Sequence, residues 1–223
     1  MSGTSSTTRR LYRKRARRYD RSFWLLRAAG MRDGRYRRRA AKALNLRPGD
    51  TVVDLGCGTG LNFPHLLERV GPAGLVVGVD LTDAMLAQAA ERVTRAGWRN
   101  VTLVESDVAD YAFPAELDGI ISTLALTLSP AFDDVIRRGA LALRDGGRVA
   151  IVDLKKPEKW PHWLVRFAAW TQSPFGVSLD LAHRHPWESI RRHLHEVCFR
   201  EFYHGAMYLS VGEKVGSDPS GAT

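Results

Sequence analysis

The stretch Thr51–Gly60, which reads TVVDLGCGTG, constrains the fold of this chain more than any other. Residues 52–55 have the apolar character of a short buried strand, and glycines follow at alternate positions, at Gly56, Gly58 and Gly60. A strand that runs into a glycine-rich turn and then a helix is how doubly wound α/β folds hold a nucleotide-like ligand. Glycine permits positive φ and lets the backbone approach a ligand closely. The sequence therefore predicts an α/β fold with a ligand at this turn.

The spacing of the glycines narrows the class of ligand. A dinucleotide fingerprint is G-x-G-x-x-G, whereas this chain has D-x-G-x-G-x-G, with Asp54 before the turn. The run resembles motif I of the class I S-adenosylmethionine (SAM)-dependent methyltransferases. That resemblance implies SAM as cofactor and S-adenosylhomocysteine (SAH) as product, with the loop around the methionine end and Asp54 near the ammonium group. Cys57 is interpreted as a loop-packing residue rather than a nucleophile. The alternative is a structural glycine turn in another α/β protein.

Two helices flank the loop in the prediction. One covers residues 61–70, with Asn62 in its first turn, and its N–H groups suit the carboxylate of SAM. The other covers residues 32–46, where Arg35 and Tyr36 could reach the same carboxylate, although a surface arginine is an equal alternative.

An apolar strand over residues 75–79 ends in Asp80. A carboxylate at that place can accept both ribose hydroxyls. The run V-G-V-D-L-T-D-A-M-L resembles the same family closely, and it implies that Asp80 binds the ribose while Leu81 and Met85 flank the adenine.

A third strand is expected over residues 101–105, followed by Asp107 and Val108. A short polar residue at this place resembles the acceptor of the adenine amino group in the family, so Asp107 is the candidate, with Val108 stacked beside the ring. The alternative is a turn-forming aspartate.

A fourth strand, residues 117–122, leads into S-T-L-A-L. Ser122 and Thr123 are expected to line the cofactor pocket, and Leu124 and Leu126 the acceptor side. DNA methyltransferases that act on exocyclic amines carry N/D-P-P-Y/F here, so this departure argues against base-amine methylation.

The charge of the chain is uneven. The formal net charge is +9, yet residues 1–48 hold sixteen Lys/Arg and two acidic residues, a balance of +14, and the remainder has a balance of −5. Residues 9–29 have apolar residues at helical spacing with arginines on the other faces. Three interpretations stay open: a lid helix on the body, a lid that also binds an anionic membrane surface, and a phosphate-binding arm for nucleic acid, the least favoured.

The same arm carries a second resemblance. Tyr12, Ala16 and the pair Tyr19-Asp20 resemble the Y-x-x-x-A-x-x-YD opening of a subgroup that contains the ubiquinone/menaquinone-biosynthesis C-methyltransferases and the bacterial phosphatidylethanolamine N-methyltransferases. The resemblance implies that Tyr19 lines the cofactor pocket and Tyr12 the acceptor pocket. Alternatively, both only pack the helix on the body.

Residues 155–185 form a tryptophan-rich segment on the acceptor side. Trp160, Trp163 and Phe167 fall at helical spacing and so share one face. They are expected either to pack on the core or to form an aromatic wall or membrane-interface patch for a hydrophobic acceptor. The K-K-P-x-x-W run resembles the quinone C-methyltransferases.

Histidines follow this segment. His183 and His185 are candidates for a single general base. No metal site is expected, because the i,i+2 pairs of histidines face apart on a helix and lack ligands at matching spacing.

The predicted architecture is a Rossmann-like, seven-stranded, mostly parallel sheet with an antiparallel last strand, helices on both faces and an N-terminal helical lid. It divides the chain into a disordered tail (1–8), a basic lid or arm (9–48), a methyltransferase domain (49–215) and a frayed tail (216–223). Further elements are expected as a helix over 130–143, a strand over 149–153, a helix over 188–197 and a hairpin at His204-Gly205.

The predicted function is methyl transfer to a hydrophobic or amphipathic small molecule: a lipid amine, a quinone precursor or a specialised metabolite. The alternatives are an RNA or protein methyltransferase anchored by the basic arm, and a non-catalytic SAM-binding module. With two cysteines, no apolar run of about 18 residues and no signal-peptide pattern, we expect a cytoplasmic protein, peripheral at the inner membrane face if the arm binds lipid. The oligomeric state is left open.

Overall fold

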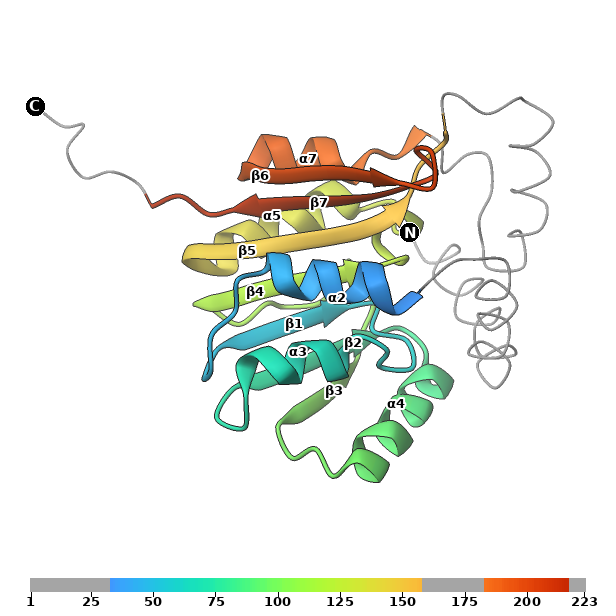
Figure 1. Cartoon of the computed structure of the whole chain (residues 1–223), viewed down its shortest axis with the longest axis vertical. Helices are drawn as coiled ribbons and strands as arrows, with labels where there is room; N and C mark the ends of the chain where they lie inside the picture. The colour runs from blue at the N-terminus through green and yellow to red at the C-terminus, as the bar shows by residue number, and fades with distance from the viewer. Residues whose placement is uncertain (1–32, 158–182, 217–223) are drawn as a thin grey trace, which may run out of the picture.

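The computed structural model describes residues 33–157 and 183–216. They form one seven-stranded sheet in the order β3-β2-β1-β4-β5-β7-β6 (Figure 1). Neighbouring strands are parallel except that β7 runs antiparallel to both β5 and β6. The strands are β1 Thr51–Leu55, β2 Leu75–Asp80, β3 Val101–Glu105, β4 Leu117–Thr123, β5 Leu143–Leu154, β6 His195–Phe202 and β7 Met207–Glu213. The predicted mostly parallel sheet with an antiparallel last strand is therefore confirmed.

Helices cover both faces of the sheet, and the apolar core is split accordingly. On one face lie α2 Asp33–Ala43, α3 Phe63–Val70 and α4 Asp83–Ala96, and on the other lie α5 Phe132–Ala142 and α7 Pro186–His193 (Figure 1). A short 3-10 helix, η1 Leu126–Leu128, follows β4. β1, β2, β4 and β7 are buried nearly throughout and mostly apolar, as is typical of strands covered by helices on both faces, whereas β3 and β6 at the two ends of the sheet are partly exposed.

The alternation of side chains along β1 and β4 determines what faces α2 and α3. Val52 and Ile121 pack into the core on that face, whereas Val53 and Ile120 pack into the core on the α5 face. Because successive residues of a strand point to opposite faces, Asp54 and Thr123 point the same way as Val52 and Ile121. The two polar side chains thus lie beneath α2 and α3.

The boundaries of two predicted elements differ from the structure. The helix expected over 188–197 is wrong in its second half: α7 ends at His193, and residues 195–202 form β6. This segment pairs with β7, from His195 opposite Glu213 to Phe202 opposite Met207, so a long-range ladder overrides the local helical pattern. The strand expected over 149–153 is the C-terminal part of the longer β5. The predicted hairpin at His204-Gly205 is present.

Several predicted segments lie outside the described residues: the tail 1–8, the arm 9–29, residues 158–182 of the tryptophan-rich segment and residues 217–223. Among the described residues, none of the helices combines the length and the apolar character that spanning a bilayer requires.

Candidate cofactor site

Three neighbouring strands carry polar side chains at their carboxyl ends, which form one edge of the sheet. β1 lies between β2 and β4, and all three run in the same direction. Asp54 and Thr123 stand at or next to the ends of β1 and β4, and Asp80 is the last residue of β2. The chain leaves β1 for β2 on one side and later returns to β4 on the other, so the strand order reverses here. Ligands of doubly wound sheets bind outside the carboxyl ends at such a switch point.

The glycine loop between β1 and α3 needs its glycines for different reasons. Gly56, Gly58 and Gly60 have φ of 66°, 55° and 77°, values that favour glycine. A Cβ at Gly56 would lie 2.3 Å from the Cβ of Ala125, whereas a Cβ at Gly58 would meet no atom of the described residues within 4 Å. Gly56 is therefore required by packing, and Gly58 borders open space on the side where a ligand can approach.

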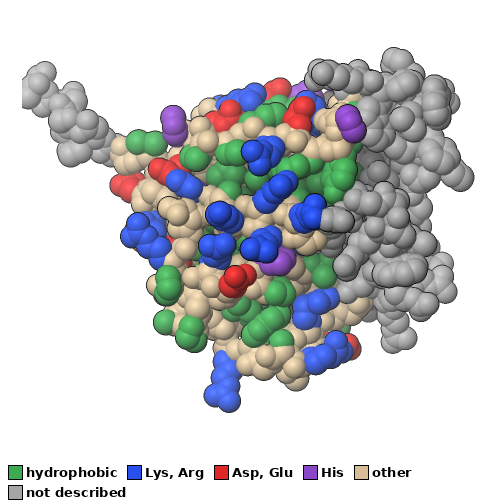
Figure 2. Space-filling model, viewed as in Figure 1, with side chains coloured by type: hydrophobic (Ala, Val, Ile, Leu, Met, Phe, Trp, Pro, Cys, Tyr) green, Lys and Arg blue, Asp and Glu red, His purple; other side chains and the backbone are tan. Residues whose placement is uncertain are grey.

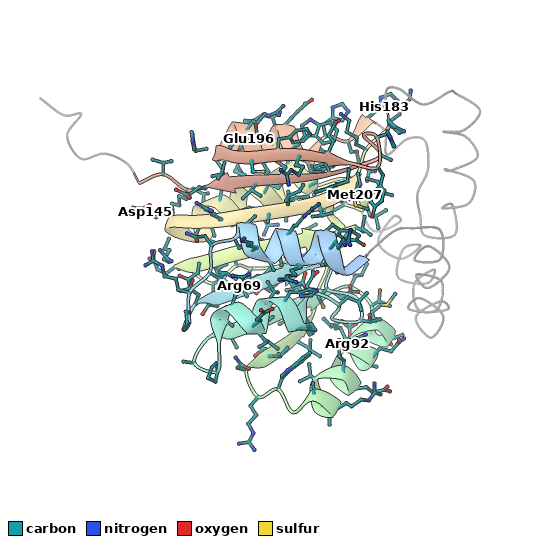
Figure 3. The ribbon with its side chains drawn as sticks, in the orientation of Figure 1. Arg69, Arg92, Asp145, His183, Glu196 and Met207 are labelled. Atoms are coloured by element: carbon teal, nitrogen blue, oxygen red, sulfur yellow. The ribbon has the colours of Figure 1, made fainter. Side chains whose placement is uncertain are left out.

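Contacts outside the loop hold it in place. The N–H of Cys57 donates to the carbonyl of Val79 over 2.9 Å, and Nε of Arg92 donates to the carbonyl of Thr59 over 2.8 Å; Figure 3 labels Arg92 on α4. The Cys57 side chain packs in the core on the α2/α3 face, and burial raises the pKa of its thiol well above the ordinary value. Such a thiol stays protonated, which fits a packing role.

Asp80 ties the glycine loop to the turn before α4. Its Oδ2 accepts the N–H of Gly58 and its Oδ1 accepts the N–H of Thr82, each over 2.9 Å. Burial raises the pKa of Asp80, and these two N–H donors oppose that rise. A carboxylate has about four acceptor positions, so two N–H bonds fix its orientation and leave capacity for further donors such as ribose hydroxyls.

Asp54 is completely buried, at 0% exposure. Its Oδ1 accepts Nδ2 of Asn62 over 2.8 Å, while Oδ2 has no hydrogen-bond partner within the described residues. Burial raises the pKa of Asp54 from 3.8 to about 7, although the Asn62 hydrogen bond and the charge of Arg37 act in the opposite direction. An unpartnered buried carboxylate oxygen is costly, and a cationic group of a ligand would satisfy it.

Arg37 is the site residue that the sequence interpretation missed. Arg35, which was considered for the cofactor carboxylate, is exposed, and Tyr36 is buried in the core. Arg37 is only 5% exposed and donates to Asn62 and Thr123. It precedes the buried Ala41 by four residues, so it lies on the inward stripe of α2, a spacing that could have identified it.

The residues predicted for the adenine end lie around the ends of β2, β3 and β4. Leu81 and Val108 are half-buried, Met85 is buried, and Asp107 accepts the N–H of Ala109 through Oδ1 over 3.0 Å. Ser122 is buried and its hydroxyl donates to the carbonyl of Leu55 over 3.0 Å. Ser122 thereby joins β4 to β1, and the neighbouring Thr123 is the one that reaches Asn62.

The residues predicted for the acceptor side are spread more widely. Leu124 is half-buried with φ of 58°, whereas Leu126 is 2% exposed and packs in the core on the α5 face. His183 is exposed and lies at the same edge as Met207, the first residue of β7 (Figure 3). His185 stacks on Trp187, with 4.6 Å between ring centroids, and its Nδ1 lies 3.1 Å from Oε1 of Glu188.

Five predicted site residues lie outside the described residues: Tyr12, Tyr19, Trp160, Trp163 and Phe167. Their assignments remain predictions. Within residues 33–157 and 183–216, no cluster of three His, Cys, Asp or Glu side chains has an arrangement that could hold a metal ion.

The raised pKa of Asp54 predicts how the stability of the ligand-free protein depends on pH. Between pH 4 and 7 Asp54 is protonated more in the folded state than in the unfolded state, so its contribution to the free energy of unfolding falls as pH rises. Asp54→Asn keeps the contact with Asn62 and removes this contribution. At pH 8 the variant should be more stable than the wild type by on the order of 2–4 kcal/mol, as measured by urea unfolding from pH 5 to 8. Burial also raises the pKa of Asp80, so the free energy of unfolding of Asp54→Asn still falls as pH rises, but with a smaller slope than that of the wild type. The exposed Asp110→Asn serves as control, and equal slopes for wild type and Asp54→Asn would contradict the prediction.

Known proteins with similar sequences are methyltransferases, whose cofactor suits this edge of the sheet. The sequence model of a family described as a methyltransferase domain matches residues 52–147. The chain is 34% identical over 127 residues to nocamycin O-methyltransferase of Saccharothrix syringae, covering 56% of this chain and 45% of the relative. It is 30% identical over 137 residues to demethylmenaquinone methyltransferase of Listeria monocytogenes, covering 61% of this chain and 57% of the relative. The chain thus spans about half the length of these curated relatives.

Solved structures show the same fold. A SAM-dependent methyltransferase from Aquifex aeolicus aligns with a TM-score of 0.58 at 21% identity, over 80% of this chain and 89% of that one. A geranyl diphosphate methyltransferase, in complex with geranyl diphosphate and sinefungin, aligns with a TM-score of 0.66 at 17% identity, over 82% and 79%.

The residues at the edge fit SAM. The unpartnered Oδ2 of Asp54 suits an ammonium group, and the open space at Gly58 suits a ligand against the loop. Asp80, oriented at the end of β2, suits the ribose hydroxyls. The family match, the sheet topology and this arrangement agree. Residues 52–147 therefore belong to a class I SAM-dependent methyltransferase domain, with SAM as its cofactor.

Proposed function

We propose that this protein transfers a methyl group from SAM to a small acceptor with a hydrophobic part. The observation that supports the proposal is the edge formed by Asp54, Asp80 and the glycine loop, where hydrogen bonds to Asn62 and to the N–H of Gly58 fix the two carboxylates beside the loop. A protein that does not bind SAM could lose these groups without consequence. Relatives named for nocamycin and demethylmenaquinone support a small-molecule acceptor.

Methyl transfer from SAM requires chiefly that the protein align the cofactor and the acceptor. When bound, SAM supplies a methyl group that its sulfonium activates for direct displacement. The chain's residues hold the two ends of the cofactor, exclude water and align the acceptor. Asp153 holds the acceptor-side turn to β5: its Oδ2 accepts the N–H of Thr127 and its Oδ1 accepts the N–H of Leu154, each over 2.9 Å. Arg184 donates through Nη1 to the carbonyls of Thr127 and Leu128, each over 2.8 Å. Both contacts keep η1 in place beside the cofactor edge.

The test is a transfer assay with SAM labelled in its methyl group. The full chain is incubated with lipid amines, prenylated quinone precursors and phenolic metabolites, and in parallel with RNA and with protein. Label in a small molecule, lost in Asp80→Ala, is the expected result. Label only in RNA or protein would favour the alternative acceptors, and SAM binding without any transfer would favour a non-catalytic module.

We further propose that the protein binds the anionic cytoplasmic face of a membrane through its basic N-terminal region. Residues 9–29 contain several arginines in the sequence, and the outward face of α2 adds exposed cations (Figure 2). These are Arg35, Arg38, Arg39 and Lys42, for which the described part of the chain contains no ion pair. Arg39 lies over the ring of Phe202, with 5.4 Å from Cζ to the centroid. Cations near an anionic leaflet contribute about 1 kcal/mol each.

Co-sedimentation with vesicles that contain anionic phospholipid tests this second proposal. Arg38→Glu with Lys42→Glu should weaken binding at least about tenfold, because two attractive charges become repulsive. The matched control is Arg191→Glu with Arg192→Glu on α7, which makes the same change in net charge on the other face of the sheet. Equal loss in both variants would indicate non-specific attraction, and no binding of the wild type at low salt would refute the proposal.

A further inference from the structure

Four side chains from four parts of the fold form one buried network. Nη1 of Arg37 donates to Oδ1 of Asn62 over 3.0 Å and also to Oγ1 of Thr123. Nδ2 of Asn62 donates to Oδ1 of Asp54 over 2.8 Å and to Oγ1 of Thr123 over 3.1 Å. The network therefore links α2, the residue before α3, β1 and β4.

The network permits one orientation of the Asn62 amide. Its oxygen faces the guanidinium of Arg37, which only donates, and its NH₂ faces the carboxylate of Asp54, which accepts when ionised. Turning the amide over would place donor against donor and acceptor against acceptor. Arg37 thus decides which group of Asn62 faces Asp54. Without Arg37, the amide loses the contact that keeps its NH₂ on the carboxylate.

Two charged side chains and one neutral thiol act on Asp54 from different elements. Arg37 on α2 favours the ionised carboxylate, whereas Asp80 at the end of β2 disfavours it, and the Cys57 thiol in the loop is neutral. Burial opposes ionisation most strongly, and the result is a pKa of Asp54 of about 7. Arg37 is the cation that sets this balance among the described residues, through its charge and through Asn62.

We propose that Arg37 is a positioning residue that acts through Asn62 to orient and ionise Asp54, and that it thereby sets the pH above which the cofactor binds tightly. The inference rests on the proposed use of this edge for SAM. A protonated Asp54 has no charge to offer an ammonium group, whereas an ionised Asp54 does. Binding near neutral pH then requires the loss of the Asp54 proton, and Arg37 lowers the pH at which that loss occurs.

The experiment measures SAH binding to the full chain by calorimetry from pH 5.5 to 8.5. Wild-type affinity should rise by up to about tenfold per pH unit on the acidic side and level off above a midpoint near pH 7. Arg37→Met keeps the bulk of the side chain and removes its charge, so the midpoint should move upward by about one pH unit or more. Arg37→Lys, which keeps the charge, should return part of the shift.

Two further variants separate this role from a structural one. Arg35→Met removes a cation from the exposed face of the same helix and should leave the midpoint unchanged. If Arg37→Met does not fold, Arg37→Gln keeps a hydrogen-bond donor in the network and still lacks the charge, and it should also shift the midpoint upward. Affinity that falls equally at every pH, with the wild-type midpoint retained, would show that Arg37 only supports the fold and would overturn the inference. SAH binding that is tight but independent of pH in the wild type would overturn it while leaving the proposed function intact, whereas no binding at any pH would overturn both.

Discussion

Asp80→Ala should weaken SAH binding by about a hundredfold or more, with the protein still folded. Two hydrogen bonds from hydroxyls to a carboxylate contribute about 1.5–3 kcal/mol each, and the substitution also leaves the N–H groups of Gly58 and Thr82 without their partner. Both the direct contacts and the shape of the loop are therefore lost. Calorimetric titration at pH 8 measures the effect, since Asp54 is ionised there.

The control for this variant is Asp110→Ala, which removes an exposed carboxylate outside the site. Its affinity for SAH should equal that of the wild type. An unchanged affinity in Asp80→Ala would mean that this carboxylate does not bind the cofactor, and the role assigned to the end of β2 would be wrong.

Gly56→Ala should destabilise the protein by about 2–5 kcal/mol. The positive φ costs an alanine about 1–2 kcal/mol, and its Cβ would lie 2.3 Å from the Cβ of Ala125, far inside the normal contact distance, so that overpacking adds about 1–3 kcal/mol. Urea unfolding measures this change. It is a large fraction of the roughly 5–15 kcal/mol that stabilises a typical domain.

Gly58→Ala is the matched comparison, because it has the same backbone strain without the clash. It should cost about 1–2 kcal/mol of stability, yet it should reduce SAH affinity, since the added methyl occupies the open side of the loop. Equal destabilisation of the two variants would contradict the division between a packing glycine and a ligand-facing glycine.

The cofactor-binding residues could be predicted because the sequence patterns that indicate them are local. The loop glycines and Asp80 belong to short runs in which strand, turn and helix follow one another, and the structure brings them together through Gly58 and Asp80. Seven mostly parallel strands with an antiparallel last strand follow from the same family resemblance, and the topology confirms them.

The misses share a physical cause, which is contact between residues far apart in the chain. Arg37 meets Asn62 and Thr123, 25 and 86 residues away, because of how α2 lies across the sheet. Its spacing from Ala41 indicates that it points inward, but the sequence does not show which side chains it meets there. Residues 195–197 were expected to continue the helix, but their pairing with β7 makes them part of β6. The sequence predicts the acceptor-binding residues least well, because methyl transfer needs alignment of the acceptor rather than a fixed set of catalytic groups.

The most direct test of the central claim is a titration of the wild-type full chain with SAH at pH 8. The structure predicts saturable binding of one SAH per chain, lost in Asp80→Ala and retained in Asp110→Ala. A folded wild-type protein that shows no saturable binding of either SAH or SAM at that pH would contradict the account.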